Sequence, residues 1–171
     1  MKPGMDDQSV AQRILDHMAN GTTDLGDDVW REPVANYRSA DRMKAEMEQV
    51  LRRSPIAFCP SAALPDVGSY IAREAAGVPL VVVRGVDGKV RAFRNACRHR
   101  GNRLIEERRG NRTGVIRCAY HSWCYNQDGS LRAAPRTENL ENFEKKDWVL
   151  RNVRLEIFAS FVFITLDDNA R

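Results

Sequence analysis

Two short segments that each carry one cysteine and one histidine constrain this chain more than any other feature. The first reads CRHRG from Cys97, and the second reads CAYHSW from Cys118, with eighteen residues between His99 and Cys118. Two thiolates and two imidazoles are a complete ligand set for bound metal. The fold must therefore bring together two loops that are distant in sequence, each contributing one sulfur and one ring nitrogen.

The ligand set has two chemically different halves. A thiolate stabilises ferric iron through its charge, whereas a neutral imidazole is a weaker donor and leaves its iron easier to reduce. With both cysteines on one iron and both histidines on another, an added electron would localise on the histidine side. The rival reading is a structural zinc site with two cysteines and two histidines. Zinc sites favour Cys-x2-Cys and His-x3-His spacings, and the Cys-x-His that opens this set is unusual among them.

The start of the chain and the length of its apolar runs indicate a cytoplasmic protein, in which cysteines stay reduced. The first residues lack the basic and apolar halves of a signal peptide, and the longest apolar run, 78–83, is far shorter than the roughly 20 residues that span a bilayer. We therefore expect a soluble cytoplasmic protein without a disulfide framework. Cys59 is expected to be a buried core thiol, and Cys124 to pack beside the site without binding metal.

After residue 54 the chain alternates short β-branched or aromatic segments with turn residues. The Asp-Gly pairs at 87–88 and 128–129 are strong hairpin signals. The strand predicted at 149–157 is expected to turn Val149, Val153 and Leu155 towards the core. Strands are predicted over the following ranges: 55–59, 69–73, 79–84, 90–94, 115–117, 149–157 and 161–166.

Two helices are predicted ahead of the strands. Apolar residues recur every four positions in the first, with Asp6 or Asp7 near its start and Gly21 just past its end. A second apolar stripe ends at Leu51, with Ser39 or Asp41 as its N-cap. The segment between the two helices, 20–36, is predicted to be a loop.

The two cysteine-histidine segments and their flanks resemble the Rieske motifs of ring-hydroxylating oxygenases, specifically the N-terminal domain of their α subunit. CRHRG at 97–101 and CAYHSWCYNQDGSL at 118–131 carry the resemblance, together with Asn95 and the closing strand pair at 155–166. The match covers roughly residues 37 to 168. Ser122 departs from it, since relatives usually have glycine there, where a less common backbone angle is expected.

The resemblance implies a mainly β fold: an antiparallel Rieske-type β-sandwich with a cluster-binding subdomain of two loops, preceded by two N-terminal helices. It implies a helical segment at 1–53, a Rieske domain at 54–166, and at 167–171 a stub where a catalytic domain would begin. One [2Fe-2S] cluster per chain is expected, bound through Cys97, His99, Cys118 and His121. The side chains expected around this cluster are Arg100, Gly101, Tyr120, Trp123 and Tyr125.

The resemblance also implies single-electron transfer, as part of an aromatic-ring-hydroxylating-type oxygenase and hence an oxidoreductase. Relatives pass electrons to a mononuclear iron held by two histidines and a carboxylate. The sequence has three histidines, and only His17 is left once His99 and His121 bind the cluster. We therefore expect no mononuclear iron in this chain and no hydroxylation by it alone. Two alternatives stay open: a free-standing Rieske ferredoxin and, from a different class, a zinc-stabilised interaction module.

Positive charge gathers around the two segments. Residues 91–136 contain eleven arginines and three acidic residues, a balance of +8, whereas residues 1–50 contain six Lys/Arg and ten Asp/Glu, a balance of −4. The expected partners are an electron-donating reductase or ferredoxin and a separate oxygenase catalytic domain, with no nucleic acid and no membrane. The arginines either steer such an acidic donor or simply form a solvated loop. They are Arg100, Arg103, Arg108, Arg109, Arg112 and Arg117.

Overall fold

The computed structural model describes residues 6–26, 29 and 31–167, and the chain divides into two compact units, Met1–Ser39 and Ala40–Arg171. In the first unit, helix α1 (Asp7–Asn20) begins where the Asp6 carboxylate accepts a hydrogen bond from Ser9 N and ends at Gly21 in the left-handed conformation. The predicted first helix and both of its caps are confirmed. None of the helices in the described residues is long and apolar enough to cross a bilayer.

The segment after α1 differs from the predicted loop. A short helix, α2 (Val34–Arg38), occupies its last residues. It begins after Pro33 without a hydrogen bond from a capping side chain, so no N-cap motif in the sequence indicated it. In the second unit, α3 (Ala40–Glu46) continues into one π-helical turn (Met47–Leu51), which confirms a helix ending at Leu51. Within its described residues, the N-terminal helical region thus contains three α-helices where two were predicted.

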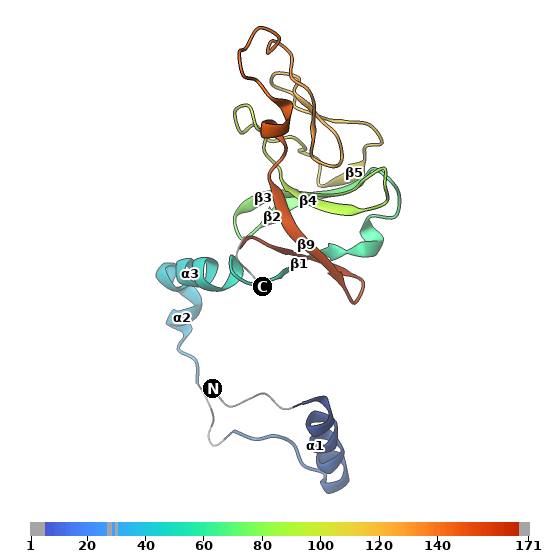
Figure 1. The fold of residues 1–171 in the computed structure, drawn as a ribbon. Helices are drawn as coiled ribbons and strands as arrows, with labels where there is room; N and C mark the ends of the chain where they lie inside the picture. Colours follow the sequence, from blue (N-terminus) through green and yellow to red (C-terminus); the bar gives the residue numbers. More distant parts are fainter. Residues whose placement is uncertain (1–5, 27–28, 30, 168–171) are drawn as a thin grey trace. The chain divides into compact units, whose positions relative to one another are not determined.

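The second unit is built on a seven-stranded antiparallel sheet (Figure 1). Its strand order is β1-β10-β9-β4-β3-β2-β5, so the first and last of the predicted strands pair with each other. The predicted antiparallel, mainly β architecture with N-terminal helices is confirmed. The strands of this sheet are β1 (Ile56–Pro60), β2 (Ser69–Ala75), β3 (Val78–Arg84), β4 (Val90–Arg94), β5 (Arg109–Asn111), β9 (Asn152–Phe158) and β10 (Phe161–Thr165).

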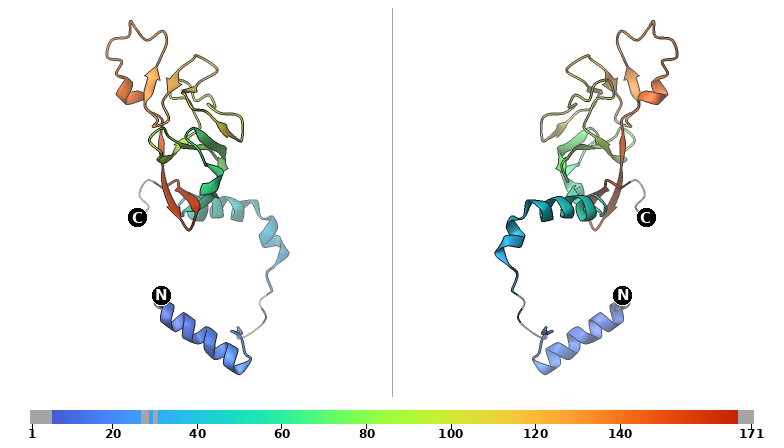
Figure 2. Two further views of the ribbon diagram at one scale, coloured as in Figure 1. Left: turned by 90° about the vertical axis from the view of Figure 1, so that its right-hand side faces the viewer. Right: turned by 90° about the vertical axis from the view of Figure 1, so that its left-hand side faces the viewer.

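A second, three-stranded sheet lies within the segment between β4 and β9. It consists of β6 (Ile116–Arg117), β7 (Cys124–Tyr125) and β8 (Leu131–Ala133), and a 3-10 helix (Lys145–Trp148) follows it. In both views of Figure 2, the yellow-to-orange part of the chain that follows β5 lies at one end of the seven-stranded sheet. The hairpins expected at Asp87-Gly88 and Asp128-Gly129 are both present, joining β3 to β4 and β7 to β8.

Two hydrophobic cores lie on opposite faces of the central strands. Alternate residues of β3 divide between them, with Val81 and Val83 in one core and Leu80 and Val82 in the other. Cys59 is buried in the second core, as predicted, and burial raises the pKa of its thiol. The first core continues from β3 and β4 into the two loops that carry the cysteine-histidine segments.

The start of β9 corrects one prediction. The strand begins at Asn152, and Val149, which was expected to face the core, is 40% exposed. Its neighbour Leu150 is buried instead, and the Leu150 N–H donates to the Gly129 carbonyl at 2.8 Å. This contact fixes the chain just before β9 against the β7–β8 hairpin, so the alternation that governs the strand does not extend back to Val149.

Candidate metal centre

The first loop leaves β4 and is held by one buried amide. The Asn95 side chain accepts hydrogen bonds from the N–H groups of Leu104 and Ile105 at 3.1 and 3.0 Å and donates to the Ile105 carbonyl at 2.7 Å. Each of these groups would otherwise be a buried polar atom without a partner. Asn95 therefore closes the loop that carries Cys97 and His99 into a fixed shape.

Within this loop the CRHRG segment forms a tight turn. The Cys97 N–H donates to the Asn102 carbonyl, and the Gly101 N–H donates back to the Cys97 carbonyl, both at 2.8 Å. Gly101 has φ +73°, a left-handed conformation that glycine adopts without steric cost. This conformation explains why glycine stands at the end of the motif.

The second loop repeats this turn between β6 and β7. The Cys118 N–H donates to the Trp123 carbonyl at 2.8 Å, and the Ser122 N–H donates to the Cys118 carbonyl at 3.1 Å. Ser122 takes the left-handed position with φ +60°, as its departure from glycine led us to expect. Both segments thus present a cysteine and a histidine from turns with the same hydrogen-bond pattern.

Replacing Ser122 with glycine is expected to stabilise the protein by about 1 kcal/mol, because glycine removes the steric cost of the left-handed conformation. The lost contact between the Ser122 hydroxyl and Arg117 is exposed and offsets little of this gain. Urea denaturation at equal iron content measures the effect. Gly101→Ala is the matched opposite change, since φ is +73° and an added Cβ meets no atom within 4 Å. A loss of stability in Ser122→Gly would show that the hydroxyl contact outweighs the backbone angle.

The two predicted sulfur ligands are both buried, at 3% and 2% exposure for Cys97 and Cys118. Burial raises the pKa of the Cys97 thiol, and the nearby Cys118 sulfur raises it further, while the Tyr125 hydroxyl at 3.3 Å from Cys97 Sγ lowers it. The Cys97 thiol is therefore protonated at neutral pH until a metal binds. Metal uptake at this pair is accompanied by release of protons.

The two predicted nitrogen ligands also lie together. The rings of His99 and His121 have centroids 4.7 Å apart and are tilted by 74°. Burial, followed by the positive charges of His121 and Arg100, lowers the pKa of His99, which favours the neutral ring that metals bind. His121 Nδ1 is buried without a hydrogen-bond partner in the described part of the chain. A buried ring nitrogen without a partner is the atom that a metal would satisfy.

Aromatic side chains surround the histidine rings. Trp123 is buried and stacks on His99 with 5.0 Å between centroids and 8° between planes, and Tyr120 lies 3.8 Å from the His121 ring. Phe143 and Trp148 pack edge-on against Trp123. Together with Tyr125, Gly101 and Arg100, all five residues expected around the site lie in or beside the two loops.

Several contacts of the site were not among the predicted site residues. Asn102 Nδ2 lies 3.9 Å from Cys118 Sγ, and Phe143 and Trp148 come from a segment about twenty residues beyond Trp123. Nothing in their spacing links these residues to the motifs. Cys124, expected to pack beside the site, is half-buried and its thiol donates to the Ser122 carbonyl at 3.2 Å.

The four predicted ligands fit a two-metal group better than one ion. In the described residues, no three histidine, cysteine or acidic side chains converge as they would on a single metal ion. A [2Fe-2S] group distributes four protein ligands over two irons, so it requires two pairs rather than one point. The sulfur pair, the ring pair and the unpartnered His121 nitrogen match that requirement.

His17 belongs to the first unit, and the two loops belong to the second. Its side chain is 29% exposed, and its ring nitrogens lie 2.9 Å from the Thr22 hydroxyl and 3.0 Å from the Asp24 carboxylate. Arg13 contacts the same carboxylate. His17 therefore organises the end of α1.

The known proteins most relevant to this site are oxygenase subunits. The chain is 39% identical over 143 residues to the carnitine monooxygenase oxygenase subunit of Escherichia coli strain K12, covering 84% of this chain and 38% of that protein. It is 30% identical over 165 residues to the anthranilate 1,2-dioxygenase large subunit of Acinetobacter baylyi, covering 95% and 33%. The chain thus spans less than two fifths of the length of these curated relatives.

Solved structures agree with the sequence comparison. A quaternary ammonium Rieske monooxygenase in complex with L-carnitine superposes with a TM-score of 0.79 at 35% identity, covering 85% of this chain and 41% of that one. Naphthalene 1,2-dioxygenase from Rhodococcus sp. superposes with a TM-score of 0.77 at 26% identity. The family model of the Rieske [2Fe-2S] domain matches residues 54–144, a range that includes both loops. The chain belongs to the Rieske [2Fe-2S] domain family, whose cofactor is the iron-sulfur cluster that gives the family its name.

Proposed function

We propose that Cys97 and Cys118 bind one iron of a [2Fe-2S] cluster and His99 and His121 the other, and that the chain transfers single electrons as the N-terminal domain of an oxygenase α subunit. One observation carries the proposal: two turns with the same hydrogen-bond pattern place the cysteines together and the histidine rings 4.7 Å apart. Bound there, the cluster supplies a one-electron couple.

The residues around the proposed ligands give the site a closed side and an open side. The cysteines are almost fully buried, whereas both histidines are half-buried and line a cavity of about 700 Å³. Trp123 fixes the His99 ring by stacking on it. Redox partners are therefore expected to approach on the histidine side.

We further propose that the parent protein is an oxygenase with a separate catalytic domain, preceded here by a helical segment at 1–53 and the Rieske domain at 54–166. The relatives named above support this, since the chain matches 38% or less of their length. A mononuclear iron site with two histidines cannot come from this sequence once His99 and His121 bind the cluster, because only His17 is left. We therefore assign that iron to a separate catalytic domain.

Electron paramagnetic resonance of the dithionite-reduced chain, with iron and zinc assays, tests the proposed function. A Rieske signal with two irons per chain is expected. Zinc in place of iron, in a colourless protein, would establish the zinc-stabilised interaction module instead. The coding sequence beyond codon 171 separates an oxygenase subunit from a free-standing Rieske ferredoxin.

The Tyr125 hydroxyl is expected to raise the midpoint potential by donating to the Cys97 sulfur, 3.3 Å away. This hydrogen bond becomes stronger on reduction, because the reduced site carries one more negative charge than the oxidised site. Tyr125→Phe should lower the midpoint by about 50 mV, which is roughly 1 kcal/mol in a one-electron couple. Spectroelectrochemical titration measures this shift. Tyr120→Phe removes an exposed hydroxyl as a control, and an equal shift in both variants would contradict the specific role of Tyr125.

The arginines near the site divide into two groups. Arg103 contacts Glu74 at 3.0 Å and Arg112 contacts Glu107 at 3.1 Å, so these two belong to surface ion pairs. Arg100 and Arg117, by contrast, line the cavity beside the histidine rings, and so does Arg136. We propose that this second group receives the acidic surface of the electron-donating reductase or ferredoxin.

The double substitution Arg100→Gln, Arg117→Gln is expected to slow oxidation of the reduced protein by ferricyanide roughly two- to fivefold at low ionic strength. The anionic probe is attracted by the same charges as an acidic partner. Stopped-flow absorbance measures the rate, and the effect should vanish in high salt. Arg103→Gln, Arg112→Gln is the control with equal change in net charge. Equal slowing in both variants would assign the effect to net charge rather than to this cavity.

A further inference from the structure

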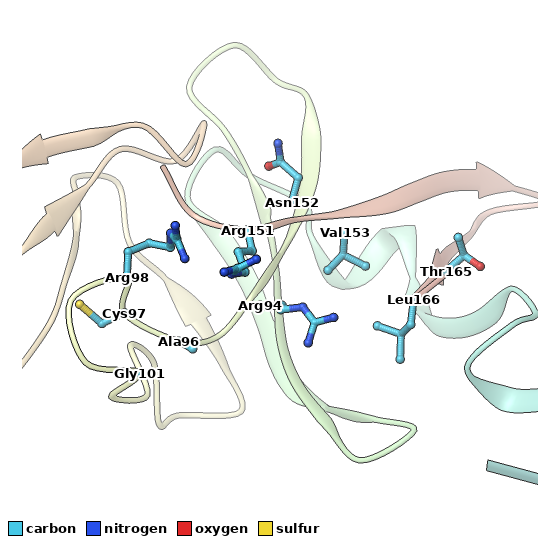
Figure 3. Close-up of a pocket in the computed structure, with 10 residues that line it drawn as sticks. All are labelled: Arg94, Ala96, Cys97, Arg98, Gly101, Arg151, Asn152, Val153, Thr165 and Leu166. Atoms are coloured by element: carbon cyan, nitrogen blue, oxygen red, sulfur yellow. The ribbon is translucent and has the colours of Figure 1, made fainter. Parts of the chain in front are cut away.

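A separate cavity lies beside Cys97 of the first loop, and among the described residues three arginines and no acidic side chain line it. Its volume is about 560 Å³, and it is bordered by the end of β4, the residues around the start of β9 and the end of β10. Arg94, Arg98 and Arg151 line it, and in the view of Figure 3 the Arg151 guanidinium lies between the other two.

The backbone places two of these side chains next to each other. The Arg94 N–H donates to the Arg151 carbonyl at 2.9 Å, which joins the end of β4 to the chain entering β9. Arg98 follows in the first loop, where its N–H donates to the Tyr125 hydroxyl at 3.0 Å. These contacts fix the backbone positions from which the three arginine side chains extend.

Among the described residues, none of the three guanidinium groups forms an ion pair, unlike Arg91, which binds the Asp87 carboxylate through two hydrogen bonds. Arg98 Nε is moreover buried without an acceptor. Three like charges around one concavity repel each other, and a buried charged donor without a partner is costly. An anion in the cavity would relieve both costs.

The remaining walls indicate the kind of anion. The planar fork of a guanidinium matches the two oxygens of a carboxylate or phosphate. Ala96, Val153 and Leu166 add apolar surface, and the Asn152 amide is a further polar group. The volume is typical of sites for small molecules, roughly 300–1,000 Å³.

We propose that this cavity binds a small multivalent oxyanion, a di- or tricarboxylate or a phosphate ester, through Arg94, Arg98 and Arg151. The site is distinct from the histidine-side cavity, although the proposed ligand Cys97 also lines it. Anion binding has its own readout, so its failure would leave the proposed redox function standing. Its carboxylate chemistry could also come from the side chains of an acidic peptide, and the test separates the two sources.

Isothermal titration calorimetry of the full chain with citrate and with inorganic phosphate tests the proposal. Saturable binding at one site per chain is expected for at least one of the two. Arg151→Gln and Arg94→Gln should each weaken it about tenfold or more, since each removes a charged donor. The matched control is Arg109→Gln on β5, at the edge of the sheet and outside the cavity, which should leave the affinity within about twofold.

Three outcomes would overturn the proposal. The first is the absence of saturable binding by either anion. The second is equal weakening in Arg109→Gln, which would mean general attraction to a basic protein. The third is binding of a Glu-rich hexapeptide but of neither small anion, which would make the cavity a contact for another polypeptide. Circular dichroism and metal content equal to those of the unsubstituted chain verify that each variant is folded.

Discussion

Replacing His99 with alanine is expected to empty the metal centre. The substitution removes one of two proposed nitrogen ligands and the ring on which Trp123 stacks. Because even indirect changes around metal sites cost about 10–100-fold in affinity, loss of a ligand should weaken metal binding by more than that and leave the purified variant with little iron. The visible absorption and the paramagnetic signal of the reduced protein should fall in proportion. Iron per chain, assayed in proteins purified in parallel, measures the effect.

His17→Ala is the matched control for this change. It removes the remaining histidine, which lies on α1 in the first unit and contacts Thr22 and Asp24. We expect unchanged iron content and spectra. Full iron content in His99→Ala would reject the assignment of that ring as a ligand, whatever the family membership.

Gly129→Ala is expected to destabilise the protein by about 3 kcal/mol or more. Gly129 has φ +87°, and an added Cβ would lie 2.5 Å from Cε1 of Phe93, which is fully buried in the first core. A left-handed alanine costs about 1–2 kcal/mol, and overpacking of a core adds about 1–3 kcal/mol. The Leu150 N–H that donates to the Gly129 carbonyl would also have to follow any shift of the turn. Urea denaturation at equal iron content measures the loss.

The other Asp-Gly hairpin supplies the control. Gly88 has φ +75°, but an added Cβ there meets no atom within 4 Å. Gly88→Ala should therefore cost only the backbone term, about 1 kcal/mol. Similar losses at the two turns would show that contact with Phe93 is unimportant and that the backbone angle alone sets the cost.

The large sheet was predictable because its long strands alternate in a regular way. β3 divides its residues between two cores, and such a pattern persists over enough residues to be recognised. β5, β7 and β8 have only two or three residues each, too few for any period to show. These strands form because neighbouring segments of the tertiary structure offer them partners.

The candidate site was predictable to a similar extent. The motif residues could be named because the cysteines, histidines and flanking aromatic residues occur at fixed spacings. The function of Asn95 as the clamp of the first loop depends on where Leu104 and Ile105 return in space, which no spacing reveals. The packing of Phe143 and Trp148 on Trp123 likewise depends on the path of the segment before β9.

The two repeated turns have a mechanical consequence. One turn extends from β4 of the seven-stranded sheet, and the other joins β6 to β7 of the three-stranded sheet, whose strands are too short to form many ladder hydrogen bonds. A metal cluster bound by both turns would act as a cross-link between the two sheets. The three-stranded sheet would then form in the same step in which the cluster binds. The chain would complete its folding only when it becomes able to transfer electrons.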